Sequence, residues 1–269
     1  MTITLGVGPV DATDNTDTAT VAVTLNGVTA GRSLAVCIRW LNATATLSSV
    51  SCTGESNLVL QTRAFEAGTS RAVQWATLDN VTTGGNKTFT ATFSGNSFHK
   101  GIAAVELVGG ETGDIFDAVA NATHAGSTNP TVNITTGAAN AALFGGVFTN
   151  AASDPTAGSG FTIITFGQTT GFAEGEYKLD AGAAGVKTVD FAAPSGAWAL
   201  SAIALNVLGP GALFNLPILT LFAEGLEVGA IFNLPILTLS AEGSGGIGTA
   251  AFNLPVLGTQ GAAGSGGSI

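Results

Sequence analysis

Two groups of acidic residues have the types and spacing that chemistry requires. Glu174 and Glu176 lie two positions apart, and on a β-strand they share one face, as the paired acids of a glycosidase do. Asp11, Asp14 and Asp17 can offer carboxylate oxygens to Ca²⁺, but they lack the glycine and the terminal glutamate of a calcium loop. Because the sequence shows no further group of catalytic or ligand residues beside the glutamates, we predict that the protein is not an enzyme and holds no metal ion.

The two cysteines, Cys37 and Cys52, allow two interpretations. If the chain turns back through residues 42–46, Cys37 lies opposite Cys52 and a cross-strand disulfide is geometrically possible. A cytosolic origin favours two reduced cysteines that pack as small hydrophobic residues. The histidines, His99 and His124, have no ligand or triad spacing, so we expect them at surface or turn positions and expect no cofactor.

Charged side chains are scarce, since 8 basic and 18 acidic residues make up 10% of the 269 positions and leave a net charge of -10. Soluble domains usually carry about 25% charged residues, so small neutral groups must form most of this surface. No basic patch remains for nucleic-acid phosphates. The chain has no apolar run long enough for a membrane-spanning helix, and its first residues do not resemble a secretory signal. We expect a protein made in the cytoplasm.

The elements that must position these residues are strands, because hydrophobicity alternates over short segments. In residues 33–40 the even-numbered positions, which include Val36 and Trp40, fall on one face and are expected to line a core. Further strands are expected at residues 18–25, 46–51, 57–61, 72–78, 87–93, 101–108, 131–135, 142–148, 161–166, 176–180, 187–191 and 197–207. Gly, Asn and Ser clusters between them indicate turns. The pattern predicts an all-β, antiparallel β-sandwich.

Several of these segments resemble a known module. They are Gly31-Arg-Ser-Leu-Ala-Val-Cys-Ile-Arg-Trp40, Leu47-Ser-Ser-Val-Ser-Cys-Thr-Gly54, residues 72–81 with 84–93, Gly158-Ser-Gly-Phe161 and residues 198–205. Together they resemble the jelly-roll or immunoglobulin-like β-sandwich of bacteriophage and bacterial surface proteins, over about residues 18–207. Where that module has an Asp and an Asn in one turn, this chain has Cys52 and Glu55. The resemblance implies a jelly-roll-like fold without a catalytic signature.

The C-terminal part repeats the segment Phe-Asn-Leu-Pro, with its phenylalanines at positions 214, 232 and 252. Each proline excludes a helix interior or a central strand at its own position. Units this small cannot bury their own apolar side chains, so they must pack on something else. The flanking Ile-Leu-Thr-Leu predicts short β repeats, and their packing between chains, as in a threefold fibre shaft or a β-prism, predicts a homotrimer. Alternatively, the segment lies along the first domain or on a partner as extended edge strands.

The predicted oligomerisation or attachment interface consists of the apolar positions of the three repeats. These are Phe214, Leu216, Pro217, Ile218, Leu219, Leu221, Phe232, Leu234, Pro235, Ile236, Leu237, Leu239, Phe252, Leu254, Pro255 and Val256.

The chain is thus expected to divide into a solvated N-terminal arm (1–17), a sandwich (18–208) and a repeat segment (209–269). Because the Pro-centred repeats also resemble those of phage fibre proteins, we expect a non-enzymatic virion protein of a tailed phage. As a tail fibre or tail-tip component it would contact itself, other virion proteins and a host surface glycan, without nucleic-acid binding or membrane insertion. A capsid decoration or head-fibre protein is one alternative, and a cell-surface carbohydrate-binding module is another.

Overall fold

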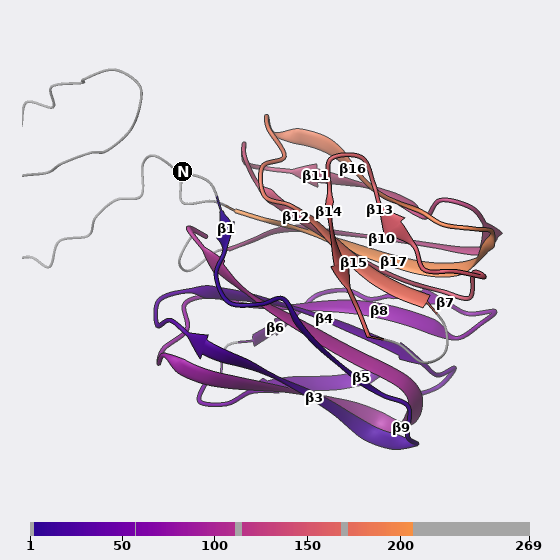
Figure 1. Cartoon of the computed structure of the whole chain (residues 1–269), viewed down its shortest axis with the longest axis horizontal. Helices are drawn as coiled ribbons and strands as arrows, with labels where there is room; N and C mark the ends of the chain where they lie inside the picture. The colour runs from indigo at the N-terminus through magenta and orange to yellow at the C-terminus, as the bar shows by residue number, and fades with distance from the viewer. Residues whose placement is uncertain (1–2, 57, 111–114, 168–171, 207–269) are drawn as a thin grey trace, which may run out of the picture. The chain divides into compact units, whose positions relative to one another are not determined.

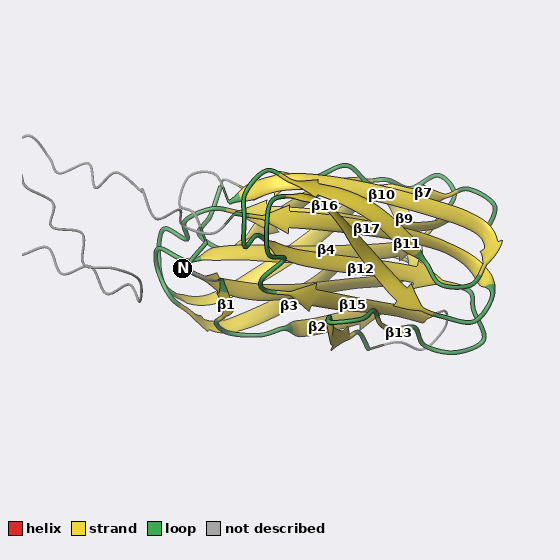
Figure 2. Ribbon diagram, turned by 90° about the horizontal axis from the view of Figure 1, so that it is seen from above, coloured by secondary structure: helices red, strands yellow, loops and turns green. Residues whose placement is uncertain are grey.

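The computed structural model describes residues 3–56, 58–110, 115–167 and 172–206, and every helix or strand assigned in these ranges is a β-strand (Figure 2). The strands pair in antiparallel fashion, so the predicted all-β class is confirmed. The three repeats and the whole predicted interface between chains lie outside the described residues.

The strands fall into two groups along the chain (Figure 1). The first group is β1 (Thr4–Leu5), β2 (Val10–Asp14), β3 (Thr18–Val28), β4 (Ser33–Leu41), β5 (Leu47–Cys52), β6 (Leu58–Leu60), β7 (Ala64–Glu66), β8 (Arg71–Leu78) and β9 (Gly85–Val108). The second group is β10 (Phe116–Ser127), β11 (Thr131–Thr136), β12 (Ala142–Thr149), β13 (Thr156–Ala157), β14 (Thr162–Thr165), β15 (Phe172–Lys178), β16 (Gly185–Ala192) and β17 (Gly196–Leu205).

The first sandwich is organised around β9, which belongs to both of its sheets. The early part of β9 pairs with β3 and β5, whereas the later part pairs with β1, β2 and β4. The second of these sheets continues from β4 through β8 to β6. On β3, Thr18 lies opposite Ser97 while Thr20 lies opposite Thr92, so β9 carries extra residues at this point. This bulge redirects the strand from one sheet to the other.

The second sandwich repeats the strand pairing of the first, with β16 and β17 in place of the two parts of β9. One sheet has the order β10-β17-β12-β15-β14, which corresponds to β2-β9-β4-β8-β6, and the other has β11-β16-β13, which corresponds to β3-β9-β5. In both sandwiches the final strand lies between the first and third strands of this set, an order consistent with a jelly-roll-like fold. The described strands between residues 10 and 205 therefore form two topologically equivalent sandwiches, where the sequence predicted one over residues 18–208.

Three apolar layers hold these sheets together. Each sandwich has its own core, which includes Trp40 and Phe89 in the first and Val189 and Phe191 in the second. A third core joins the two sandwiches, because Cys37 and other residues on the opposite face of β4 pack in one cluster with residues of β12 and β17. The predicted core face of residues 33–40 is confirmed, but the other face of this strand is buried as well.

The N-terminal residues differ from the arm expected over residues 1–17. β1 and β2 pair with β9, and Ile3 is 1% exposed within the core that joins the sandwiches. The acidic residues of β2 form ion pairs with cations on other strands: Asp11 with Arg39 of β4, and Asp14 with Lys100 of β9. Local polarity suggested a solvated segment, whereas distant partners satisfy these charges.

The shared core predicts that the two sandwiches unfold together. Phe144 is fully buried there, with its ring 6.0 Å from that of Trp75. Phe144→Ala removes this contact and leaves a cavity, so we expect a loss of about 3–5 kcal/mol in unfolding free energy. Urea denaturation followed by tryptophan fluorescence and circular dichroism measures this loss.

The matched control is Val186→Ala, since Val186 is 68% exposed on β16 and its truncation is expected to change stability by less than about 0.5 kcal/mol. Two separate unfolding transitions in the unaltered protein would contradict a shared core.

Candidate functional site

Four of the eight basic residues are buried, which is unusual for such side chains. Arg39, Arg71, Lys87 and Lys100 are each at most 9% exposed. Each has polar or aromatic partners that offset the loss of water, although the buried Nε of Arg71 has no hydrogen-bond partner among the described residues. The cations of this protein thus hold loops in place as often as they face solvent.

Lys100 fixes one end of the first sandwich. Its Nζ donates to the carbonyl oxygens of Thr16 at 2.8 Å and Ser97 at 2.5 Å, and it lies 3.3 Å from the carboxylate of Asp14. Burial alone would raise the pKa of Asp14, but hydrogen bonds from Thr16, Thr18 and Lys100 outweigh burial and hold that pKa well below its usual value. The β2–β3 turn is therefore fastened to the bulge in β9.

Further hydrogen bonds lock neighbouring loops to the same end. The side-chain Nδ2 of Asn42 donates to the backbone carbonyl of Asn96 at 2.7 Å, and the backbone amide of Asn42 donates to the Ser70 carbonyl at 2.9 Å. The amide of Thr46 donates to Ser94 Oγ at 3.0 Å. Hydrogen bonds thus connect the β2–β3, β4–β5 and β7–β8 loops and the β9 bulge into one surface, which we call the loop corner.

The loop corner exposes an aromatic ring. Phe98 is 50% exposed, whereas Trp40, Trp75, Phe89 and Phe93 of this sandwich are buried and Phe65 is partly buried. The next residue, His99, has a left-handed backbone with φ of 51°, which is uncommon outside glycine. His99 Nδ1 forms a hydrogen bond with Asn15 Oδ1 at 3.0 Å. We assign the loop corner as the candidate recognition surface.

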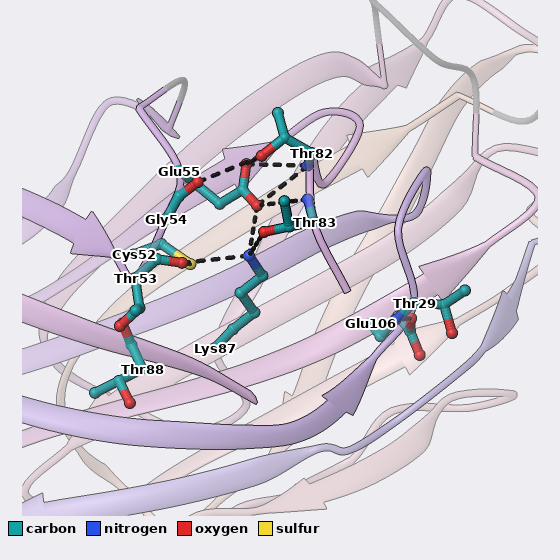
Figure 3. Close-up of polar contacts among 10 residues, drawn as sticks. All are labelled: Thr29, Cys52, Thr53, Gly54, Glu55, Thr82, Thr83, Lys87, Thr88 and Glu106. Carbon is teal, nitrogen blue, oxygen red and sulfur yellow. Dashed lines mark hydrogen bonds and ion pairs between the residues drawn. The ribbon is translucent and has the colours of Figure 1, made fainter. Parts of the chain in front are cut away.

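A second buried lysine fastens two turns to the start of β9 (Figure 3). Lys87 Nζ lies 2.6 Å from the carboxylate of Glu55 and also donates to the Thr53 carbonyl and to Thr83 Oγ1. Both side chains of the ion pair are at most 3% exposed. Burial alone would raise the pKa of Glu55, but hydrogen bonds from Lys87, Thr82 and Thr83 outweigh it and lower that pKa. This cluster consists of satisfied groups and is structural.

Arg39 links the two sandwiches. Its guanidinium binds Asp11 of β2 at 2.9 Å, donates to the carbonyl of Gly167 at 3.0 Å, and lies 4.4 Å from the ring centroid of Phe166. Asp11 in turn accepts the amide of Gly167 at 2.8 Å. A segment of the second sandwich is thereby fastened to β2 and β4 of the first.

The glutamate pair considered for glycoside hydrolysis lies inside the second sandwich. Glu174 is 4% exposed and accepts the amide of Phe166, and Glu176 is 0% exposed and accepts the amide of Gly158. Burial raises the pKa of Glu174 to about 7 and that of Glu176 to about 8. Their burial places the pair away from any substrate, and their backbone contacts hold the segment between β13 and β15.

The cysteines are not opposite one another, because β4 pairs with β8 and β9 rather than with β5. Cys37 lies opposite Trp75 and Ala103, whereas Cys52 lies opposite Phe89. Both are free and buried, so the possible disulfide is not formed. Burial raises the pKa of Cys37 to about 12 and of Cys52 to about 11, which keeps both thiols protonated.

The other candidates are dispersed. Asp11 and Asp14 bind separate cations, and among the described residues no group of three His, Cys, Asp or Glu side chains is arranged to hold a metal ion. His99 belongs to the loop corner, whereas His124 stacks against Trp198 in the second sandwich. The sequence analysis did not predict the exposed ring of Phe98, because this residue lies between the strands expected at 87–93 and 101–108, in a segment to which no role was assigned.

No protein-family model, curated protein or solved structure matches this chain. Within the described part of the chain, no helix has the length and hydrophobicity needed to cross a membrane. Function must therefore be inferred from the chain's own surfaces.

Removing the cation of the Glu55 cluster is expected to destabilise the first sandwich. Lys87→Met keeps the aliphatic stem but leaves the buried Glu55 carboxylate without its cation, which typically costs about 3–5 kcal/mol. The unfolding free energy from urea denaturation measures this loss.

Lys187→Met is the matched control, because β9 and β16 both begin with Gly-x-Lys-Thr and Lys187 is partly exposed. We expect the control to change stability by about 0.5 kcal/mol or less. Equal effects of the two variants would show that the ion pair does not determine the stability.

The buried glutamates predict a stability that falls as the pH rises. The pKa values of Glu174 and Glu176 in the folded state, about 7 and about 8, lie above the ordinary value of 4.5. The folded state therefore keeps protons that the unfolded chain releases above that value. This stabilisation is complete below about pH 4.5 and is lost as pH rises through 7 and 8, by on the order of a few kcal/mol. Urea denaturation at about pH 5, 7 and 9 measures the loss.

The double variant Glu174→Gln and Glu176→Gln carries neutral groups at every pH, so its stability is expected to vary much less between these pH values. Asp180→Asn, at an exposed position, serves as the control. Asp14 and Glu55 act in the opposite direction, because their lowered pKa values remove stability only on acidification. An unchanged slope between pH 5 and 9 in the double variant would refute this origin of the pH dependence.

Proposed function

We propose that this chain is a non-enzymatic structural virion protein of a tailed bacteriophage, and that it acts as a tail-fibre or tail-tip component that adheres to the host surface. The observation that carries the proposal is the inward placement of cations around a rigid, largely neutral loop corner. Such a surface makes neutral hydrogen bonds with glycans and has no positive field to attract nucleic acid.

The outer sheet of the first sandwich supports an adhesive rather than a catalytic role. Its solvent side presents short hydroxyl side chains, with Thr20 and Ser49 on either side of Thr92. Thr24 and Thr88 also pair across the strands through their hydroxyl groups at 2.9 Å. A face of paired neutral hydroxyls offers many weak hydrogen bonds, which suits adhesion to a polar ligand.

The repeat segment supplies the proposed assembly function. Three Phe-Asn-Leu-Pro units with their apolar flanks suit a shaft in which three chains contribute equivalent strands. In a capsid decoration or head-fibre protein, the same repeats would clamp neighbouring subunits while the sandwiches project. The exposed ring of Phe98 is also a feature of carbohydrate-binding modules, and a glycan-binding module outside a virion is therefore a second candidate.

Removal of the repeats is expected to abolish oligomerisation. In light scattering after size-exclusion chromatography, the full chain should be a homotrimer, whereas a chain ending at residue 208 and the double variant Phe214→Ser with Phe232→Ser should be monomers. The melting transition of the sandwiches should remain, because their cores are built from other residues. Loss of the oligomer and of this transition in one step would show that the repeats complete the sandwich core.

Immunogold electron microscopy with an antibody to the sandwiches tests the location. We expect the gold label at the tail of particles of the encoding phage. Label on the head would instead indicate capsid decoration. Particles that lack the protein would refute the proposed function.

A further inference from the structure

The loop corner has an exposed aromatic ring with polar side chains in the same surface, as a sugar-binding site requires. Phe98, at 50% exposure, is the one aromatic side chain among the exposed large hydrophobic residues of the described part of the chain. The exposed residue Asn96 and the side chain of Asn15 belong to the same corner, whereas the side chain of Asn42 is used inside it, by the Asn96 carbonyl, Thr44 and Ala45. A pyranose ring has an apolar face of C–H groups and a rim of hydroxyls, so an aromatic ring next to amide groups complements it.

The backbone around Phe98 is held in place before any ligand arrives. Ser97 Oγ donates to the Leu41 carbonyl at 3.1 Å, while the Ser97 carbonyl accepts Lys100. On the other side of Phe98, the left-handed backbone of His99 is accompanied by the hydrogen bond to Asn15. A strained residue persists only where its surroundings determine it, and such residues cluster at functional sites. Preorganisation of this kind lowers the entropic cost of binding.

The charges at the corner select among sugars. Lys100 is 1% exposed, and its ammonium group is occupied by carbonyl oxygens and by Asp14. The acidic side chain of Asp17, in the same turn, faces solvent. An anionic sugar would meet this carboxylate without an exposed lysine to balance it, so the corner favours neutral sugars.

We propose that the loop corner of the first sandwich binds a neutral pyranose residue of a glycan, with the sugar ring stacked on Phe98 and its hydroxyls hydrogen-bonded by exposed polar side chains of the corner, such as Asn96. The inference deepens the proposed adhesive function and rests on it for the source of the glycan. It assigns recognition to the first sandwich alone.

Saturation-transfer difference NMR on the full chain tests the site directly. The probes are the methyl α-pyranosides of glucose, galactose and mannose, N-acetylglucosamine, and N-acetylneuraminic acid as the anionic sugar. We expect transfer to at least one neutral probe and at most a weak signal from the anionic one. Phe98→Ala should reduce the neutral signal at least fivefold, because the stacking surface is lost.

Two variants keep the result interpretable. Phe98→Trp should retain the signal, since it preserves an aromatic face, and Val186→Ala should leave it unchanged, since it shortens an exposed apolar side chain of the other sandwich. Circular dichroism melts should show that all variants remain folded, as expected for exposed positions.

The proposal is overturned if no neutral probe receives saturation, or if Phe98→Ala and the unaltered chain give equal signals. Either result leaves the virion location to be decided by the microscopy. Conversely, Phe98-dependent binding by a protein missing from phage particles would support the sugar site and remove the proposed phage role.

Discussion

The first sandwich depends on β9, because this one strand of 24 residues pairs with strands of both sheets. A bulge near Ser97 turns it from one sheet to the other, and a buried lysine holds the loops at each end of its first part. Lys87 binds Glu55 beside the turns at its start, and Lys100 binds the β2–β3 turn at the bulge. These clamps let a strand with alternating Thr and apolar residues serve two layers, because the ammonium groups satisfy carbonyl oxygens of the turns and of Ser97 in the bulge. The loop corner depends on this bulge, because Ser97 and Lys100 of the bulge bind the surrounding loops.

The same clamps account for the scarcity of exposed charge. Arg39, Lys87 and Lys100 are desolvated, and each is compensated by a carboxylate and by carbonyl oxygens. An ion pair buried in this way contributes specificity of position rather than large net stability, because desolvation offsets much of the Coulomb attraction. Threonine, serine and asparagine therefore supply much of the polar exterior, and the acidic excess gives a net charge of -10.

Much of the fold is predictable from the sequence, since a period of two identifies strands and the Gly-Asn and Gly-Ser clusters mark turns. The duplication was harder to detect, because alternation does not distinguish a strand with one buried face from a strand such as β4 that is buried on both. The Gly-x-Lys-Thr start shared by β9 and β16 was an available signal. The roles of Asp11 and Asp14 were not predictable, because their cations lie on β4 and β9, far along the chain. Likewise, only the tertiary bulge explains why Phe98 faces solvent.

The two sandwiches share a topology but differ at the corresponding end, which bears on where recognition resides. In the first sandwich, Asp14 lies opposite Lys100, and their ion pair holds the β2–β3 turn. The aromatic ring of Phe98 remains exposed to solvent. In the second, His124 lies opposite Trp198 and the two rings stack, with the indole buried and its N–H donated to a serine hydroxyl. An aromatic residue is therefore part of the scaffold at one end and available to a ligand at the other. A duplicated fold that uses ionic clamps in one copy and aromatic packing in the other can reserve its exposed ring for binding.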